Sequence, residues 1–187
     1  MKKRLHYYSG ENREIDYKER ESRMIKVLFV CHGNICRSPM AEFVFKDMVK
    51  KRGLSDLFHI ASAATSTEEI GSVVHHGTRR VLNALGISTE GKRAVQMTKK
   101  DYRDYDYIIA MDHRNVININ RIIGADTQRK VHKLLDLTPR GGDIADPWYT
   151  GDFERTYEDI YEGCEALLRM ICHRHHISFE EQLEADA

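Results

Sequence analysis

Two cysteines, an arginine and a serine stand close together in the stretch VLFVCHGNICRSP, residues 27–39. An apolar run leads directly into Cys31, and Arg37 follows it after five intervening residues. A tight loop between a strand and a helix points several backbone N–H groups inward, and the helix start adds partial positive charge. Such a loop is suited to binding a tetrahedral oxyanion.

The side chains of this stretch add a nucleophile to the anion site. Arg37 can hold two phosphate oxygens with one guanidinium fork, which a lysine cannot do. A thiolate at Cys31 would be stabilised by the loop dipoles and by Arg37, and Ser38 can donate a hydrogen bond to it. Gly33 permits an unusual backbone conformation, and Asn34 tolerates a left-handed one. We therefore predict covalent phosphoryl transfer to Cys31.

Charge and composition exclude several function classes. The chain of 187 residues balances 29 Lys and Arg against 29 Asp and Glu, which gives no overall attraction to nucleic acid or to an anionic membrane. It has no apolar run of about 18 residues, so we expect no membrane span. The four cysteines lack zinc-type spacing. Because the N-terminus does not resemble a secretory signal, we expect reduced thiols and a cytoplasmic location.

Strand and helix patterns alternate along the chain. We expect strands at 25–30, 58–64, 105–111 and 130–137, and helices at 38–53, 76–86, 113–124 and 153–174, with a short extended piece at 93–97 and a capping box at 98–101. Ser38 is the expected cap of the first helix, with Pro39 at its first helical position. This alternation predicts an α/β fold, a parallel sheet with helices on both faces. Ligands bind beyond the carboxyl ends of such strands, where residues 31–37 lie.

The two ends of the chain differ from the middle. Residues 1–23 are mostly polar and have neither strand nor helix periodicity, so we expect a flexible N-terminal extension. Residues 24–175 are the expected folded domain. Residues 176–187 are the expected C-terminal tail, because the last ten residues carry four acids and no base.

The segment VLFVCHGNICRSPMAE closely resembles the active-site segment of the low-molecular-weight protein tyrosine phosphatases. Three further segments resemble that family in the same order, SAATST (62–67), AMDHRN (110–115) and DPWY (146–149). The resemblance covers residues 25 to about 172. It implies a four-stranded parallel sheet and a hydrolase that works through a phosphocysteine intermediate.

The resemblance also assigns the catalytic roles. Cys31 attacks phosphorus, Arg37 stabilises the transferred phosphoryl group, and Asp146 protonates the leaving phenolate before it activates water. A phenolate is a poor leaving group without a proton, so a positioned carboxylic acid is needed. Pro147 stiffens the loop that carries this acid.

The remaining site residues are expected to bind phosphate, to hold the loop or to line the substrate cleft. The backbone N–H groups that hold the phosphoryl oxygens belong to His32, Gly33, Asn34, Ile35, Cys36 and Arg37. The loop and the thiolate are fixed by Asn34, Ser38 and Ser62. The cleft is lined by Ile35, Glu68, Trp148 and Tyr149. Cys36 can also capture an oxidised Cys31 as a disulfide, as the family does.

Some positions depart from the family pattern. Glu68 stands where relatives often have an aromatic residue. Lys92 and Val95 stand where many relatives have histidine and arginine, and we expect Lys92 to support Asn34 and Ser62 less firmly. We expect these changes to alter the choice of substrate.

Other functions remain alternatives. A protein-arginine phosphatase tends to carry threonine at the position of Ile35, and an apolar Ile35 suits a flat phenyl ring better. Arsenate reductase on the same fold needs two relay cysteines, but no cysteine lies between Cys36 and Cys164. A non-catalytic phosphate-binding module would lack Cys31, Arg37 or Asp146, and all three are present.

We therefore expect a phosphotyrosine-containing protein or a small aryl phosphate as the substrate. No nucleic acid or membrane partner is expected, and the chain should be a monomer or a weak dimer. The histidines at 75–76 and 173–176 have no acidic or thiol partner at ligand spacing. The mechanism needs no metal and no cofactor.

Overall fold

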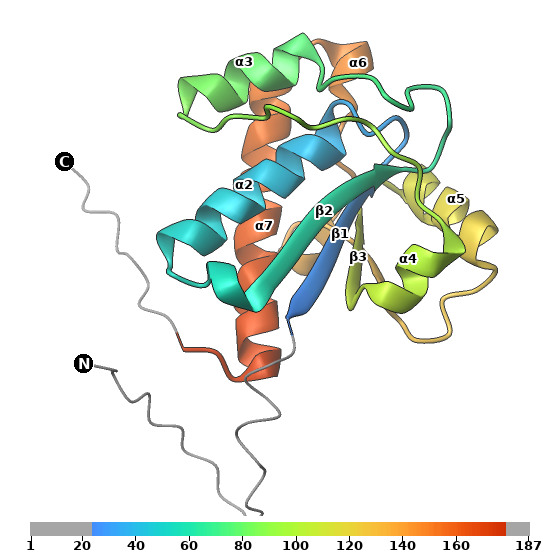
Figure 1. The fold of residues 1–187 in the computed structure, drawn as a ribbon, viewed down its shortest axis with the longest axis vertical. Helices are drawn as coiled ribbons and strands as arrows, with labels where there is room; N and C mark the ends of the chain where they lie inside the picture. Colours follow the sequence, from blue (N-terminus) through green and yellow to red (C-terminus); the bar gives the residue numbers. More distant parts are fainter. Residues whose placement is uncertain (1–23, 179–187) are drawn as a thin grey trace, which may run out of the picture.

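The computed structural model describes residues 24–178, which form a four-stranded sheet with helices on both faces (Figure 1). The predicted extension at 1–23 and most of the predicted tail, 179–187, lie outside the described residues. The strands are β1 (Ile25–Cys31), β2 (Phe58–Ala64), β3 (Tyr107–Ala110) and β4 (Val131–Lys133). They are all parallel and lie in the order β2-β1-β3-β4. The sequence-based prediction of an α/β fold with a parallel sheet is confirmed.

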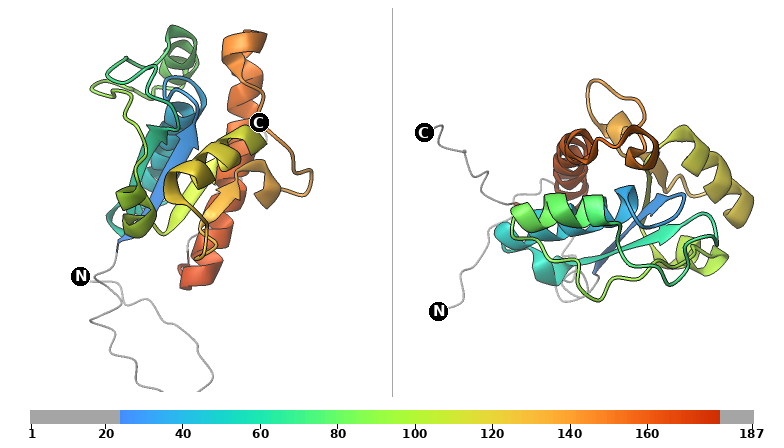
Figure 2. Two further views of the ribbon diagram at one scale, coloured as in Figure 1. Left: turned by 90° about the vertical axis from the view of Figure 1, so that its right-hand side faces the viewer. Right: turned by 90° about the horizontal axis from the view of Figure 1, so that it is seen from above.

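Helices connect the strands, as the alternating pattern requires. The longer helices are α2 (Arg37–Lys51), α3 (His76–Ala84), α5 (His113–Ile123) and α7 (Phe153–His175). The short ones are α4 (Lys99–Asp104), α6 (Pro147–Thr150) and the 3-10 turns η1 (Ser55–Leu57) and η2 (Leu135–Leu137). The left view of Figure 2 shows α7 running along most of the length of the molecule.

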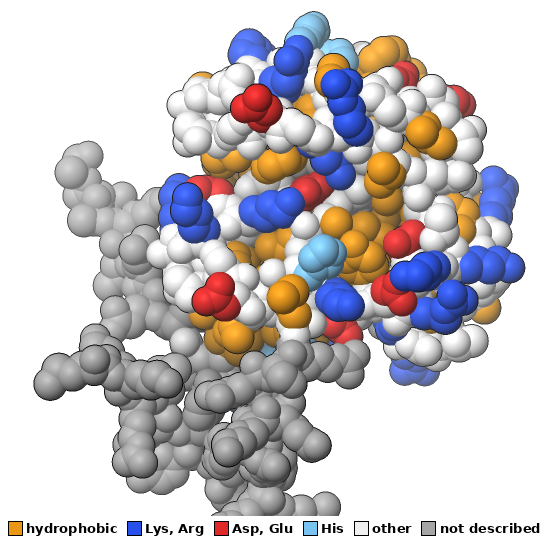
Figure 3. Space-filling view, viewed as in Figure 1, with side chains coloured by type: hydrophobic (Ala, Val, Ile, Leu, Met, Phe, Trp, Pro, Cys, Tyr) orange, Lys and Arg blue, Asp and Glu red, His pale blue; other side chains and the backbone are white. Residues whose placement is uncertain are grey.

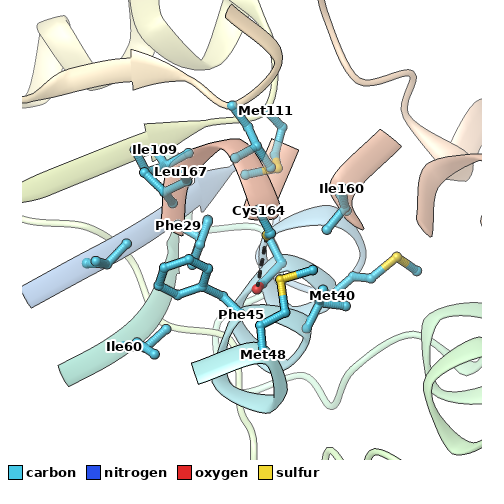
Figure 4. Close-up of a cluster of buried hydrophobic side chains, with 14 of the residues drawn as sticks. Phe29, Met40, Phe45, Met48, Ile60, Ile109, Met111, Ile160, Cys164 and Leu167 are labelled. Carbon is cyan, nitrogen blue, oxygen red and sulfur yellow. Dashed lines mark hydrogen bonds between the residues drawn. The ribbon is translucent and has the colours of Figure 1, made fainter. Parts of the chain in front are cut away.

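Strand β1 separates the hydrophobic core into two layers because its side chains alternate between the faces of the sheet. Val27 and Phe29 pack with α2 and α7, whereas Leu28 and Val30 pack with residues of α4 and α5. Figure 4 shows the first layer, where Phe29 meets Phe45 of α2 edge-to-face at 5.6 Å between ring centroids. Each fully buried side chain of this size stabilises the fold by about 2 kcal/mol. The two core layers hold the carboxyl end of β1, where Cys31 lies.

The face of the molecule in Figure 3 carries basic and acidic side chains side by side, around hydrophobic side chains over the sheet. Neither sign of charge dominates that face, which fits the balanced composition. None of the described helices is both long enough and apolar enough to cross a membrane.

Most predicted elements are present, but the fourth strand is shorter than predicted. The prediction ran through 130–137, whereas β4 ends at Lys133 and the chain turns into η2. Leu134 already has helical backbone angles, and it packs so closely on α7 that a side chain at Gly163 would meet its Cγ at 2.5 Å. Burial of Leu134 and Leu135 explains the apolar run without a longer strand.

The predicted cap of α2 is also wrong. Cys36 is the N-cap residue, the helix begins at Arg37, and the hydroxyl of Ser38 does not cap it. That hydroxyl is buried and contacts Cys31 instead. The predicted capping box at 98–101 is confirmed, because the side chain of Asp101 accepts the Thr98 N–H at 2.6 Å.

Candidate active site

The loop between β1 and α2 brings the predicted nucleophile and its partners together. Cys31 is the last residue of β1, and its Sγ accepts the Asn34 N–H at 3.3 Å. The Ser38 hydroxyl lies 3.1 Å from the same sulfur. Cys31 is buried, so the loop dipoles and Ser38 replace water around the sulfur. The predicted proximity of Cys31 and Ser38 is therefore present.

The backbone of this loop leaves hydrogen-bond donors unused. Among residues 24–178, no protein group accepts the N–H of Gly33, Ile35 or Cys36. Such unpaired donors at a helix start suit the oxygens of a phosphate group. The geometry thus matches the predicted anion site.

Asn34 holds the loop in shape from within. Its φ is +58°, the left-handed conformation predicted for it. Its side-chain amide donates to the hydroxyls of Ser38 at 2.9 Å and Ser62 at 2.8 Å, and its oxygen accepts the Val95 N–H at 3.1 Å. The conformation expected of Gly33 is wrong, since Gly33 has no positive φ. Glycine is suited there because an added Cβ would lie 3.3 Å from Glu69.

A buried carboxylate beneath Ser62 was not predicted from the sequence. Glu42 of α2 accepts hydrogen bonds from the Ser62 hydroxyl and from Lys46, and forms an ion pair with Lys92 at 2.9 Å. Burial opposes its charge, but Lys92 and Lys46 hold the pKa of Glu42 below its usual range. The available signal was an acid placed between apolar residues of one helix.

Lys92 supports this network, contrary to the loosening that we expected. Its ammonium donates to the carbonyl of Ser62 at 2.9 Å as well as pairing with Glu42. The lysine therefore ties β2 to α2 behind the loop, and Ser62 passes that support on to Asn34.

Arg37 lies between two carboxylates. Its guanidinium donates to Asp112 at 2.6 Å, to Asp146 at 2.5 Å and to the carbonyl of Ile144 at 3.0 Å. Burial alone would lower the pKa of Arg37, but the negative charges of Cys31, Asp146 and Asp112 outweigh it and raise the pKa. The guanidinium is thus charged and fixed, and the predicted acid reaches the predicted arginine.

Asp112 is a site residue that the sequence analysis quoted but gave no role. One oxygen caps α5 by accepting the Asn115 N–H at 2.6 Å, and the other binds Arg37. Its position directly after the buried apolar run of β3, at the carboxyl edge of the sheet, was the signal that could have found it.

The predicted cleft residues lie on three separate segments. Ile35 is nearly buried in the loop, whereas Trp148 and Tyr149 are exposed on α6 by 58% and 85%. Asp146 caps α6 by accepting the Trp148 N–H at 3.1 Å, so the acid is held at the start of the helix that carries these aromatic rings. Glu68 lies in the segment after β2, and its carboxylate is 2.9 Å from Nε2 of His32.

His75 connects the loop to these aromatic side chains. Its backbone N–H donates to the carbonyl of Ile35 at 2.8 Å, and its ring stacks on Phe153 and meets Trp148 edge-to-face at 5.6 Å. Burial, followed by the charges of His76 and Arg79, lowers the pKa of His75. The loop between β1 and α2 (residues 32–36, called the phosphate loop below), α3 and α6 therefore meet at one end of the molecule (Figure 1).

Comparison with known proteins places the chain in a family. The family model for low molecular weight phosphotyrosine protein phosphatase matches residues 26–181. The chain belongs to this family. A Bacillus subtilis member, the low molecular weight protein-tyrosine-phosphatase YfkJ, is 43% identical over 150 residues, which are 79% of this chain and 96% of YfkJ.

Solved structures of this phosphatase family have the same fold. The crystal structure of YfkJ from Bacillus subtilis matches with a TM-score of 0.79 at 42% identity and covers 82% of this chain and 98% of that one. DARP, a Drosophila arginine phosphatase, matches with a TM-score of 0.72 at 32% identity and covers 79% and 98%. The recognised family and the four-stranded sheet are thus confirmed.

Proposed function

We propose that this phosphatase hydrolyses phosphotyrosine and other aryl phosphate monoesters, with Cys31 as the nucleophile. The observation that carries the proposal is the sulfur of Cys31 at the base of a loop with unused N–H donors, beside Arg37. The printed name of the YfkJ relative, a protein-tyrosine-phosphatase, supports the same activity.

In the first step the thiolate of Cys31 forms a sulfur–phosphorus bond as the bond to the phenolic oxygen breaks. The N–H groups of the loop and the guanidinium of Arg37 stabilise the three phosphoryl oxygens. Asp146, in its acid form, gives its proton to the departing phenolate. The products are the free phenol and a phosphocysteine.

In the second step water attacks phosphorus and the sulfur–phosphorus bond breaks. Asp146, now a carboxylate, accepts a proton from the water, and the thiolate of Cys31 leaves with its electron pair. Inorganic phosphate is released, and both side chains regain their starting states. No metal or cofactor takes part in either step.

The dianionic substrate also changes the pairing of Arg37. Without phosphate the guanidinium binds Asp112 and Asp146. A bound phosphate competes for the same donors and displaces Asp146 from Arg37. Substrate binding therefore prepares the acid that the first step needs.

Phosphoarginine is the alternative substrate, since DARP is named an arginine phosphatase. Ile35 favours phosphotyrosine because its apolar side chain offers no hydroxyl to a guanidinium and packs well against a phenyl ring. We expect kcat/KM for a phosphotyrosine peptide to exceed that for the matched phosphoarginine peptide by about 10²-fold, as expected where a buried polar group would stay unpaired. Phosphate release from both peptides measures this ratio, and a ratio that favours phosphoarginine would replace the proposed substrate.

Arsenate reduction is not supported by the positions of the remaining thiols. Cys164 and Cys172 lie on α7 and are packed in the hydrophobic core. Burial raises the pKa of the Cys164 thiol well above its usual range and that of Cys172 to about 11. Neither thiol is suited to pass a disulfide from Cys31 to a reductase.

We also propose that Cys36 protects Cys31 from overoxidation by peroxide. The sulfenic acid formed on Cys31 would react with the Cys36 thiol to give a disulfide and water. Burial, and next the charge of Cys31, raises the pKa of Cys36 to about 12, so most of this thiol is protonated at neutral pH. The disulfide should therefore form slowly near neutrality and faster as pH rises.

The Cys36→Ser variant should regain less activity than the wild type after hydrogen peroxide and then a thiol reductant. The recovered fraction of the initial activity of each protein, followed at several pH values, measures the protection. Equal recovery in both proteins would remove Cys36 from this role.

We infer that the protein acts in the cytoplasm. All four cysteines are free, which fits a reducing compartment. Fractionation of cells that express the chain would test the location, and recovery mainly in an exported fraction would contradict it.

A further inference from the structure

We propose that Glu68 and Glu69 form an acidic rim beside the phosphate loop that selects phosphotyrosine flanked by basic residues. This inference rests on the proposed function and specifies its substrate class. The rim consists of two adjacent carboxylates next to the loop between β1 and α2, to which the phosphate dianion is proposed to bind.

Backbone hydrogen bonds fix the rim segment to the loop. The Thr65 N–H donates to the carbonyl of Cys31 at 2.8 Å, and the Ser66 N–H donates to that of His32 at 3.0 Å. Beyond the two acids, the His75 N–H donates to the carbonyl of Ile35 at 2.8 Å. The rim is thus bound to the loop on both of its sides, and its position relative to bound phosphate is fixed.

Each acid contacts the loop through a different residue. The carboxylate of Glu68 is 2.9 Å from Nε2 of His32, and its side chain remains 71% exposed. The side chain of Glu69 lies against Gly33, where an added Cβ would meet its Cγ at 3.3 Å. Burial and then the charge of Cys31 raise the pKa of Cys36, and the negative charge of Glu69 adds to that rise, so its field reaches the loop.

Among the residues that the structure describes, the rim has no lysine or arginine as an ion-pair partner. Within residues 24–178, neither Glu68 nor Glu69 forms an ion pair with a lysine or an arginine, and His32 is the ion-pair partner of Glu68. Arg93 donates to the carbonyl of Gly71 at 3.4 Å, two residues beyond the rim. The guanidinium of Arg37 is paired with Asp112 and Asp146.

The rim therefore discriminates by the charge of the peptide around phosphotyrosine. The loop and Arg37 bind the phosphate group in the same way in every peptide. The side chains that flank phosphotyrosine differ between peptides, and they lie close to the rim. One exposed charge pair about 6 Å apart changes an equilibrium constant about threefold. The factors of two carboxylates multiply, so the rim should favour lysine over aspartate in the flanks by about tenfold at low salt, and high salt should screen the difference.

The test compares three phosphotyrosine peptides that differ in their flanking residues, which are lysine, glutamine or aspartate. We expect kcat/KM of the wild type to be about tenfold higher for the lysine peptide than for the aspartate peptide at about 0.02 M salt. The two values should converge at about 0.5 M salt. The Glu68→Gln/Glu69→Gln double variant should lose most of the preference at low salt.

The control is Asp56→Asn/Glu90→Gln, which removes the same charge from η1 and from the loop after α3. This control should keep the wild-type preference, because a rim effect is local and an effect of net charge is not. Equal kcat/KM for the lysine and aspartate peptides in the wild type would overturn the inference. A preference that survives in the rim variant, or disappears in the control, would also overturn it.

The proposed function and the proposed rim are contradicted by different results. Absence of turnover for the glutamine peptide would contradict the proposed function, whereas turnover without charge preference would contradict only the rim. Binding of the three peptides to the Cys31→Ser variant gives a second measurement that does not depend on turnover. Equal affinities at low salt would overturn the rim even if no peptide were hydrolysed.

Discussion

The Cys31→Ser variant is expected to lose turnover of aryl phosphates by about 10⁴-fold or more while it still binds inorganic phosphate. A serine hydroxyl needs a base to become a nucleophile. The two groups that contact Sγ are the Asn34 N–H and the Ser38 hydroxyl, and neither is a base. Hydrolysis of p-nitrophenyl phosphate and phosphotyrosine measures the loss, and calorimetry measures phosphate binding.

The control for this substitution is Cys172→Ala, which removes a thiol from α7 in the core, far along the chain from the loop. It should keep wild-type turnover, provided that its circular dichroism shows the folded protein. Turnover near the wild-type value in Cys31→Ser would reject the phosphocysteine mechanism. Loss of phosphate binding together with turnover would instead mean that the loop itself depends on the thiol.

The geometry of the loop could be predicted because its determinants are close in sequence. Cys31, Asn34 and Arg37 lie within one strand, one loop and one helix start, where spacing almost fixes geometry. The strands could be predicted where burial on both faces gives continuous apolar runs, as in β1. The same rule predicted a fourth strand that was too long, because Leu134 and Leu135 are buried by α7 rather than by the sheet.

The supports of the loop could not be predicted because they depend on distant contacts. Glu42 meets Lys92 across 50 residues, and Asp112 meets Arg37 across 75. Local pattern predicted no role for Glu42 or Asp112, and the family pattern predicted a weaker support from Lys92 than the structure shows. Ser38 shows the same limit, since a serine before proline suggests a cap, while its hydroxyl contacts the thiol. Tertiary contacts decide between two uses of one side chain.

These contacts also explain how a protein without net charge can bind a dianion. The positive field is local, formed by Arg37 and the loop N–H groups, and two carboxylates balance Arg37 until phosphate arrives. Binding is therefore an exchange of anions at one guanidinium. The same exchange connects affinity to catalysis, because one of the displaced carboxylates is the proposed acid.

The Asp146→Ala variant is expected to lower kcat/KM, which reports the first step, by about 10³-fold for phenyl phosphate and much less for p-nitrophenyl phosphate. The difference follows from the leaving group, because a nitrophenolate departs without a proton and a phenolate does not. The same variant should bind inorganic phosphate more tightly than the wild type, since Arg37 loses a competing carboxylate at 2.5 Å. Steady-state rates over a series of phenols, with inhibition by phosphate, measure both effects.

Asp112→Asn separates the loss of the proton donor from the loss of a carboxylate that competes for Arg37. It also weakens an ion pair of Arg37 but removes no proton donor. It should bind phosphate more tightly, as Asp146→Ala does, yet keep the weak leaving-group dependence of the wild type. If Asp146→Ala lowered kcat/KM equally for all phenyl phosphates, the carboxylate would be acting through Arg37 and not as an acid in the first step. If both variants acquired the steep dependence on the leaving group, proton transfer would depend on the pair of carboxylates as a unit, and the assignment of the acid to Asp146 alone would be wrong.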